Sequence, residues 1–369
     1  MSNPPRLKKI GDRIVEAAVK LATDDEQELV FRHGIFCQVG LPHSRQPERR
    51  FERVFKNASV LIQAGELWDG YKWVEQPLPF GAKPRVAMFY IDSVAVKQRS
   101  VFIDIGKSFN RFGELIGIPA QGKNFYEMKR QMNALSAASM TLGFTSIEGK
   151  PNTLQLGHPI KRFEAWFTRD DRQQPLWPGV LELSPEYLET LLEHAVPIPL
   201  EAIKALTHSS LSLDLLTWAA RRLPKITKPE RIPFVAFKEQ FGQEYRELRV
   251  FRRKFLHSMR QVQAVYHDAK IESVTGGLLF KPSRPMVPSK TVIQGYRLPS
   301  EPPKALPYPL PSADLTERTM EQFKRICPRM DVYACKAAFD NWLPSAPEQP
   351  RNYQRAFLGF AKTWGKQQT

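Results

Sequence analysis

One stretch of the sequence, residues 245–266 (YRELRVFRRKFLHSMRQVQAVY), carries two superimposed patterns. Its apolar residues recur every three or four positions, at Leu248, Phe251, Phe255, Met259, Val262 and Tyr266. Basic residues recur with the same steps, at Arg246, Arg249, Arg253, His257 and Arg260. At about 100° per residue, the two sets fall on nearly opposite sides of a helix. The stretch therefore predicts one long helix that packs one side on a core and leaves arginines on the other.

Short elements are expected on both sides of this helix. Residues 232–242 (IPFVAFKEQFG) predict a short helix that ends at Gly242. Residues 270–281 (KIESVTGGLLFK) predict two short strands around a Gly-Gly turn. This is the order of a winged helix, in which the long helix enters the major groove and the hairpin contacts the neighbouring backbone. On the basic face alone, a solvated side of a core helix is an equally good interpretation; the flanking elements favour DNA binding.

A similar order of elements is expected earlier in the chain. The predicted sequence is strand, helix, strand, helix, long helix and hairpin, over residues 57–65, 86–96, 101–105, 107–116, 124–142 and 143–167. Pro84 lies near the start of the first of these helices, where its missing N–H costs nothing. The long helix is expected to bury Met128, Met132 and Leu135 and to expose its polar side. The two parts of the chain share this order rather than their sequence.

Composition limits the class of partner. The formal net charge of +16 and a pI near 9.7 favour a polyanion. The sequence has no apolar run long enough to span a membrane and no leader pattern, so we expect no membrane partner. Its three cysteines have neither the number nor the spacing of a zinc site or a disulfide framework. These features favour a DNA-associated protein of the reducing cytoplasm.

The chain divides into five segments by composition and periodicity. We expect a polar N-terminal arm at residues 1–55, winged-helix domains at 56–183 and 184–284, a proline-rich linker at 285–311 and a small helical module at 312–369. The expected fold class is α+β, with two tandem winged-helix domains. Aromatic residues in the last segment are too frequent for a disordered tail.

Motifs that would carry catalysis were not found. Residues 117–124 (GIPAQGKN) almost match a phosphate-binding loop, but Asn124 stands where Ser or Thr would bind magnesium, and the motif follows an expected helix rather than a strand. The histidines form no His-x-His pair for a metal-dependent nickase. The carboxylates are scattered, so no acid/base pair can be assigned. The sequence therefore predicts neither an enzyme nor a cofactor or metal site.

With these motifs in view, residues 55–285 resemble the plasmid-encoded RepA family of replication initiators. In the first half the resemblance rests on residues 78–81 (LPFG), Pro84, Arg85 and 105–109 (IGKSF). In the second half it rests on residues 195–198 (AVPI), 212–223 (SLDLLTWAARRL), 240–242 (QFG) and 276–278 (GGL). Each piece is weak alone, whereas their order over two domains is fairly specific.

The resemblance implies an initiator that binds origin repeats (iterons) in duplex DNA, promotes opening of the adjacent DNA and recruits the host replicative helicase or its loader. It also implies a bacterial protein in a monomer–dimer equilibrium that represses its own gene and controls plasmid copy number. A winged-helix repressor acting only at its own operator remains the alternative, because both classes bind operators.

The DNA contacts implied by the resemblance lie on the two long helices and the two hairpins. In the second domain they are Arg246, Arg249, Arg253, Arg260 and Lys281. In the first domain they are Lys123, Arg130, Asn133 and Lys150.

Overall fold

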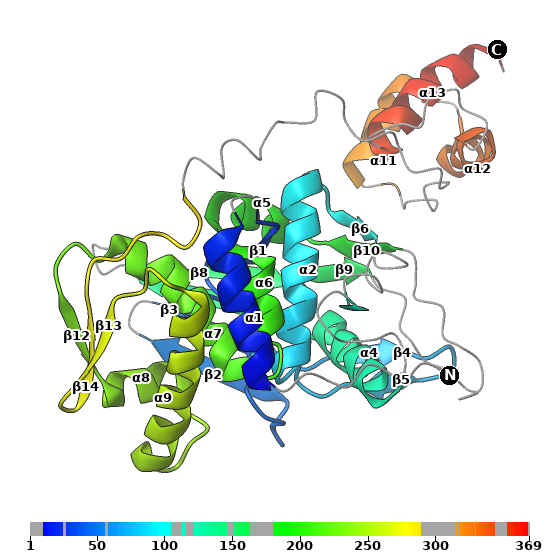
Figure 1. Cartoon of the computed structure of the whole chain (residues 1–369). Helices are drawn as coiled ribbons and strands as arrows, with labels where there is room; N and C mark the ends of the chain where they lie inside the picture. Colours follow the sequence, from blue (N-terminus) through cyan, green and yellow to red (C-terminus); the bar gives the residue numbers. More distant parts are fainter. Residues whose placement is uncertain are drawn as a thin grey trace, which may run out of the picture. The chain divides into compact units, whose positions relative to one another are not determined.

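The computed structural model describes residues 10–24, 27–55, 58–104, 113–114, 122–145, 151–162, 180–288, 315, 317–328, 330–343 and 353–367. The chain forms two compact units, Met1–Tyr296 and Arg297–Thr369 (Figure 1). The first unit combines helices with small antiparallel sheets, and the described part of the second is helical. The expected mixed α and β composition is therefore confirmed.

The helices of the first unit agree broadly with the periodicity of the sequence. They are α1 (Ile10–Thr23), α2 (Ala82–Gln98), α4 (Gly122–Ala137), α5 (Pro185–His194), α6 (Leu200–Leu206), α7 (Ser210–Arg222), α8 (Phe234–Phe241) and α9 (Leu248–Val265), with a 3-10 turn η1 (Leu223–Lys225) after α7. Helix α4 ends earlier than expected, because the chain enters a strand at Ser139. Apart from residues 113–114, the helix expected at 107–116 lies outside the described residues.

The strands of the first unit form five small sheets. Four strands pair in the order β2-β3-β7-β8, and three pair as β6-β10-β9. Three more pair as β12-β14-β13, and two pairs stand alone, β1-β11 and β4-β5. The bounds are β1 (Leu29–His33), β2 (Arg50–Phe55), β3 (Ala58–Gln63), β4 (Glu66–Trp68), β5 (Trp73–Glu75), β6 (Phe102–Asp104), β7 (Ser139–Thr145), β8 (Pro151–Gly157), β9 (Ile160–Arg162), β10 (Val180–Leu183), β11 (Ala195–Pro199), β12 (Glu230–Pro233), β13 (Ile271–Val274) and β14 (Gly277–Phe280).

Residues 10–55, expected as a polar arm, are integral to the first unit. Strand β1 pairs antiparallel with β11, which places Val30 opposite Ile198. Helix α1 packs on α6 and α9 (Figure 1). Strand β2 forms a hairpin with β3 across the expected boundary at residue 55. An acidic stretch at residues 24–28 (DDEQE) precedes the short buried strand β1, in which Val30 and Phe31 are only 2% and 4% exposed.

The two hairpins that follow the long helices differ in their strand partners. In the second half, β14 pairs with β12, the strand before α8. In the first half, β7 pairs with β3, whereas β6 pairs with β10. The similar order of elements in the two halves therefore does not produce the same sheet.

Helix α9 is held by an aromatic core from four elements. The ring centroids of Phe237 and Phe255 are 4.5 Å apart, and those of Trp218 and Phe280 are 5.3 Å apart. Burial of such rings contributes roughly 1.5–3 kcal/mol each. At Gly242, the end of α8, an added Cβ would lie 2.5 Å from the Phe251 ring. Glycine is therefore required there for the close approach of α8 and α9.

The second unit has a core of its own. Helices α11 (Glu317–Ile326), α12 (Val332–Trp342) and α13 (Tyr353–Gln367) surround the buried rings of Phe323, Phe339 and Phe357. The Asp331 side chain caps α12 by accepting a 2.8 Å hydrogen bond from the Tyr333 N–H. These helices lie in the segment where aromatic content predicted a helical module.

Candidate nucleic-acid interface

Helix α9 presents a basic side to solvent. Its apolar side chains Phe251 and Phe255 are completely buried, as expected from the periodicity. On the opposite side Arg249, Arg253 and Arg260 are all exposed, and we call these three the α9 basic face. Within the described part of the chain, none of the three forms an ion pair with a carboxylate. The face therefore carries three uncompensated positive charges on a rigid element, so an anion could bind there without displacing an internal partner.

The ends and flanks of α9 differ in detail from the prediction. Arg246 is exposed just before the helix begins. Leu248, expected on the buried side, is 39% exposed because it is the first helical residue. Two exposed cations were missed: Arg252 lies 4.8 Å from the centre of the Phe234 ring, and Lys254 lies 5.5 Å from that of Tyr245. The signal for them in the sequence was the run of three basic residues at 252–254. A pattern of every third or fourth residue selects only the middle one, Arg253, and passes over its two neighbours.

The hairpin β13–β14 follows α9, as expected. Its turn consists of Thr275 and Gly276 rather than of two glycines, because Gly277 already pairs with Val274. Gly276 has a φ angle of +76°, which residues with a Cβ atom rarely adopt. Arg231 of β12 is exposed and donates a 2.6 Å hydrogen bond to the carbonyl of Thr275. Lys281 is half-buried and forms an ion pair with Glu272, so its charge is partly compensated.

Helix α4 exposes only some of the DNA contacts that were predicted for the first domain. Lys123 is exposed, and Arg130 is half-exposed and pairs with Glu127 at 3.0 Å. Asn133, expected on the outer side, is only 7% exposed, so its side chain does not reach the surface. Lys150 lies outside the described residues.

A further cation, Lys83 of α2, belongs to the surroundings of α4. Burial chiefly lowers the pKa of Lys83; Glu127 opposes this shift, and the charges of Arg130 and Lys123 add to it. Positive charges therefore gather around the exposed side of α4, with Glu127 as a counter-charge.

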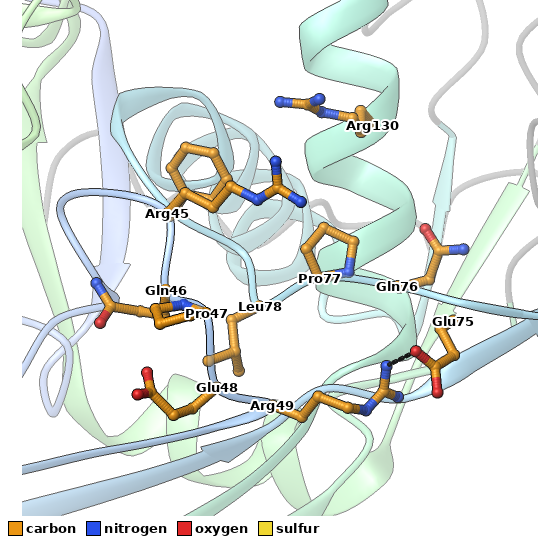
Figure 2. Close-up of a pocket in the computed structure, with 11 residues that line it drawn as sticks. Arg45, Gln46, Pro47, Glu48, Arg49, Glu75, Gln76, Pro77, Leu78 and Arg130 are labelled. Carbon is orange, nitrogen blue, oxygen red and sulfur yellow. Dashed lines mark ion pairs between the residues drawn. The ribbon is translucent and has the colours of Figure 1, made fainter.

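A pocket of about 610 Å³ lies beside α4. Its lining includes Arg45, Arg49, Glu75 and Arg130 (Figure 2). In Figure 2 the guanidinium groups of Arg45 and Arg130 lie on one side, and the 3.1 Å ion pair between Arg49 and Glu75 lies on the other. Charges of both signs are therefore present, and the pocket is a weaker anion site than the α9 basic face.

A buried network of charged side chains joins elements that are distant in the sequence. We call it the clamp; its members are His43, Arg53, Arg85, Asp214 and Glu244. Arg85 of α2 forms a two-point ion pair with Asp214 of α7, with N–O distances of 2.6 and 2.7 Å. Arg85 also donates to the carbonyl of Leu41 at 2.6 Å. Burial alone would raise the pKa of Asp214, but the charge and hydrogen bonds of Arg85 lower it overall.

Glu244 forms the other end of the clamp, in the turn between α8 and α9. Its carboxylate accepts hydrogen bonds from the backbone N–H groups of His43 and Ser44, at 2.9 and 3.0 Å, and from Arg53 at 2.8 Å. Burial opposes ionisation of Glu244. The hydrogen bond from the His43 backbone N–H, the charge of Arg53 and the hydrogen bond from the Ser44 hydroxyl outweigh burial and lower the pKa of Glu244. Glu244 is therefore held as a carboxylate.

His43 lies between the two ion pairs. Its ring nitrogens lie 3.0 Å from the Ser210 hydroxyl and 3.0 Å from the Phe241 carbonyl. Burial, followed by the positive charge of Arg85, lowers the pKa of His43 to about 4. The ring is therefore neutral at pH 7 and donates one hydrogen bond while accepting another.

Residues 78–237 match the family model described as "Plasmid encoded RepA protein". We call this matched stretch the RepA segment. This finding confirms the resemblance drawn from the sequence. Arg85 and Asp214 lie within the RepA segment, whereas α9 and the hairpin β13–β14 follow it. Two motif residues of the resemblance thus form a buried ion pair of the clamp rather than a DNA-facing surface.

The chain is also similar to two crystal structures of RctB. The first, of selenomethionine derivatives of domains 2 and 3, has a TM-score of 0.44 and 11% identity over 69% of this chain and 99% of that chain. The second, of domains 2–3, has a TM-score of 0.39 and 10% identity over 67% of this chain and 96% of that chain. No curated protein matches the sequence.

The described residues contain neither a metal-binding group nor a membrane-spanning helix. Among the described residues, no three His, Cys, Asp or Glu side chains are grouped in a way that could hold a metal ion. No described helix is both long and apolar enough to cross a membrane.

Proposed function

We propose that the chain is a plasmid replication initiator that binds repeated origin sequences in duplex DNA through the α9 basic face. The RepA segment supports the role in replication. The observation that carries the DNA-binding proposal is the exposure of Arg249, Arg253 and Arg260 on one side of a helix whose other side is packed. Arginine forms two-point hydrogen bonds with guanine in the major groove and with phosphates.

A winged-helix docking mode fits the second half of the unit. The elements α7, β12, α8, α9, β13 and β14 follow in that order, and the sheet order is β12-β14-β13. Helix α9 has 18 residues, so it is about 27 Å long and can cross a major groove. In this mode α9 reads bases, and Arg231 at the hairpin turn contacts the neighbouring phosphates.

Helix α4 supplies the second contact in this proposal. Its exposed cations Lys123 and Arg130 bind the next stretch of the duplex, so that one chain covers two successive grooves. Opening of the adjacent DNA, recruitment of the host helicase or its loader and a monomer–dimer equilibrium complete the proposed initiator role. The second unit, with a core of its own, is the candidate for docking a replication protein.

The first test is a footprint of the purified chain on DNA flanking its own gene, across a salt series. Repeated protected sites with a steep salt slope are expected, because phosphate contacts dominate the affinity. Salt-sensitive binding without any preferred site would overturn the proposal. Permanganate reactivity beside the repeats then separates an initiator from a pure repressor, since only an initiator exposes unpaired thymines.

A further inference from the structure

Glu244 lies in the turn that leads into α9. It lies two residues before Arg246 and four before the first residue of the helix. Among the described residues, its carboxylate accepts hydrogen bonds from groups of an earlier segment: the backbone N–H groups of His43 and Ser44 and the side chains of Ser44, Gln46 and Arg53. The start of α9 is therefore tied to residues almost 200 positions earlier in the chain.

The same earlier segment is tied to the body of the first half. Arg85 of α2 donates to the carbonyls of Leu41 and Pro42, at 2.6 and 3.1 Å. Asp214 of α7 accepts from Arg85, and an added Cβ at Gly40 would lie 2.6 Å from this carboxylate. The segment continues into Arg45, which lines one pocket with Arg130 of α4 (Figure 2). One loop thus contacts the start of α9, the helix α2 and the surroundings of α4.

The chemistry of the clamp favours a geometric role over a stabilising one. Burying ion pairs costs a desolvation energy that their attraction often only offsets, so such pairs are weak sources of net stability. Arg53 is completely buried, and its Nε atom has no hydrogen-bond partner among the residues that the structure describes. A charged group held under these conditions specifies one arrangement, because any other leaves it without its carboxylate.

We propose that Glu244 is a positioning residue that fixes the spacing and helical phase between α9 and α4 on DNA. The proposal rests on the proposed function, in which both helices contact the duplex. We call the stretches of duplex contacted by α9 and by α4 the two half-sites. When the clamp is formed, one separation of these half-sites fits both helices. With Glu244 neutralised, α9 stays on its core and still binds its own half-site, but its start loses the ion pair with Arg53, so its direction relative to α4 is held less tightly.

The test compares the full chain with Glu244→Gln on DNA in which the footprinted half-sites are moved apart. The wild type is expected to lose at least 10-fold in affinity when five base pairs are inserted, because half a turn places one site on the opposite side of the duplex. For Glu244→Gln, the affinities for natural and altered spacing are expected to differ by less than about 3-fold. Its affinity for an isolated α9 half-site should stay within 2-fold of that of the wild type. A purely structural role would lower both affinities together.

Two further measurements keep the proposal testable if Glu244→Gln folds poorly. Ser44→Ala removes one hydrogen bond to Glu244 at an exposed position and should relax the spacing preference by a smaller factor. Hydrogen exchange of the free chain should be faster at the amides of His43 and Ser44 in either variant. Unchanged spacing preference in folded variants would overturn the positioning role alone. Absence of repeat-specific binding by the wild type would overturn the proposed function as well, whatever the exchange rates show.

Discussion

The α9 basic face gives the sharpest quantitative prediction. Replacing Arg249, Arg253 and Arg260 together by Ala removes three exposed positive charges without touching the buried side of the helix. Each phosphate neutralised by a protein cation contributes about 0.9 to the slope of log K against log[salt]. If each arginine meets one phosphate, the slope becomes shallower by about 2.7.

The same slope sets the expected loss of affinity. If the variant and the wild type bind equally at 1 M salt, the loss of three such contacts weakens binding about 500-fold at 0.1 M salt, which corresponds to about 4 kcal/mol. The difference between variant and wild type should shrink as salt rises and almost vanish near 1 M. A base contact by one of the arginines adds about 1–3 kcal/mol at the matching position, and this part should persist in high salt.

The assay is fluorescence anisotropy with a labelled duplex that contains one footprinted repeat, measured at a series of salt concentrations. The control replaces Lys20, Lys97 and Lys324 by Ala, which lowers the net charge equally at exposed residues that the proposal does not assign to the interface. The control should change the slope by less than about 0.5. Equal slopes for the α9 variant and the wild type would refute the assigned interface, and equal loss in both variants would show a general charge effect.

Three further predictions concern the stability of the first unit: one tests the aromatic core under α9, and two test the clamp. Phe255→Ala should destabilise the first unit by about 3–5 kcal/mol in urea unfolding, because the ring is completely buried; a loss below about 1 kcal/mol would contradict the core described for α9. Asp214→Asn leaves Arg85 buried without its counter-charge and should cost about 3–5 kcal/mol by the same measurement, whereas a neutral outcome would mean that the ion pair does not form. Folding lowers the pKa of His43 from 6.5 to about 4, so between these pH values the unfolded chain binds a proton that the folded chain does not. The free energy of unfolding is therefore full above pH 6.5 and falls by about 3 kcal/mol towards pH 4. His43→Gln should flatten this part of the stability–pH curve, and an unchanged curve would show that His43 is not its source.

Local patterns were sufficient for the elements of the proposed interface. Periodicity placed α9 within three residues at its start and one at its end, because an amphipathic helix reports its buried side through residues three and four apart. The cap of α5 is equally local: the Ser184 side chain accepts from the Tyr187 N–H, and Pro185 is the first helical residue, where its missing N–H costs nothing. Both depend on neighbours in the sequence alone.

Other features depended on partners that the sequence does not place. Asn133 was expected on the outer side of α4 from its angle on the helix, yet its side chain is buried in the tertiary structure. The strand β1 is short and follows an acidic stretch, and its pairing with β11 joins residues about 165 positions apart. Periodicity within a short window carries no information on such pairs.

The sequence by itself therefore determined the helices, the second hairpin and the basic side of α9, because these follow from spacing within a few turns of chain. Only the tertiary structure showed that residues 10–55 belong to the body and that the clamp connects His43, Arg53, Arg85, Asp214 and Glu244. The physical reason is that a buried charge is tolerated only where opposite charges and hydrogen bonds converge on it. In this chain those groups come from four separate parts of the sequence, and folding alone brings them together.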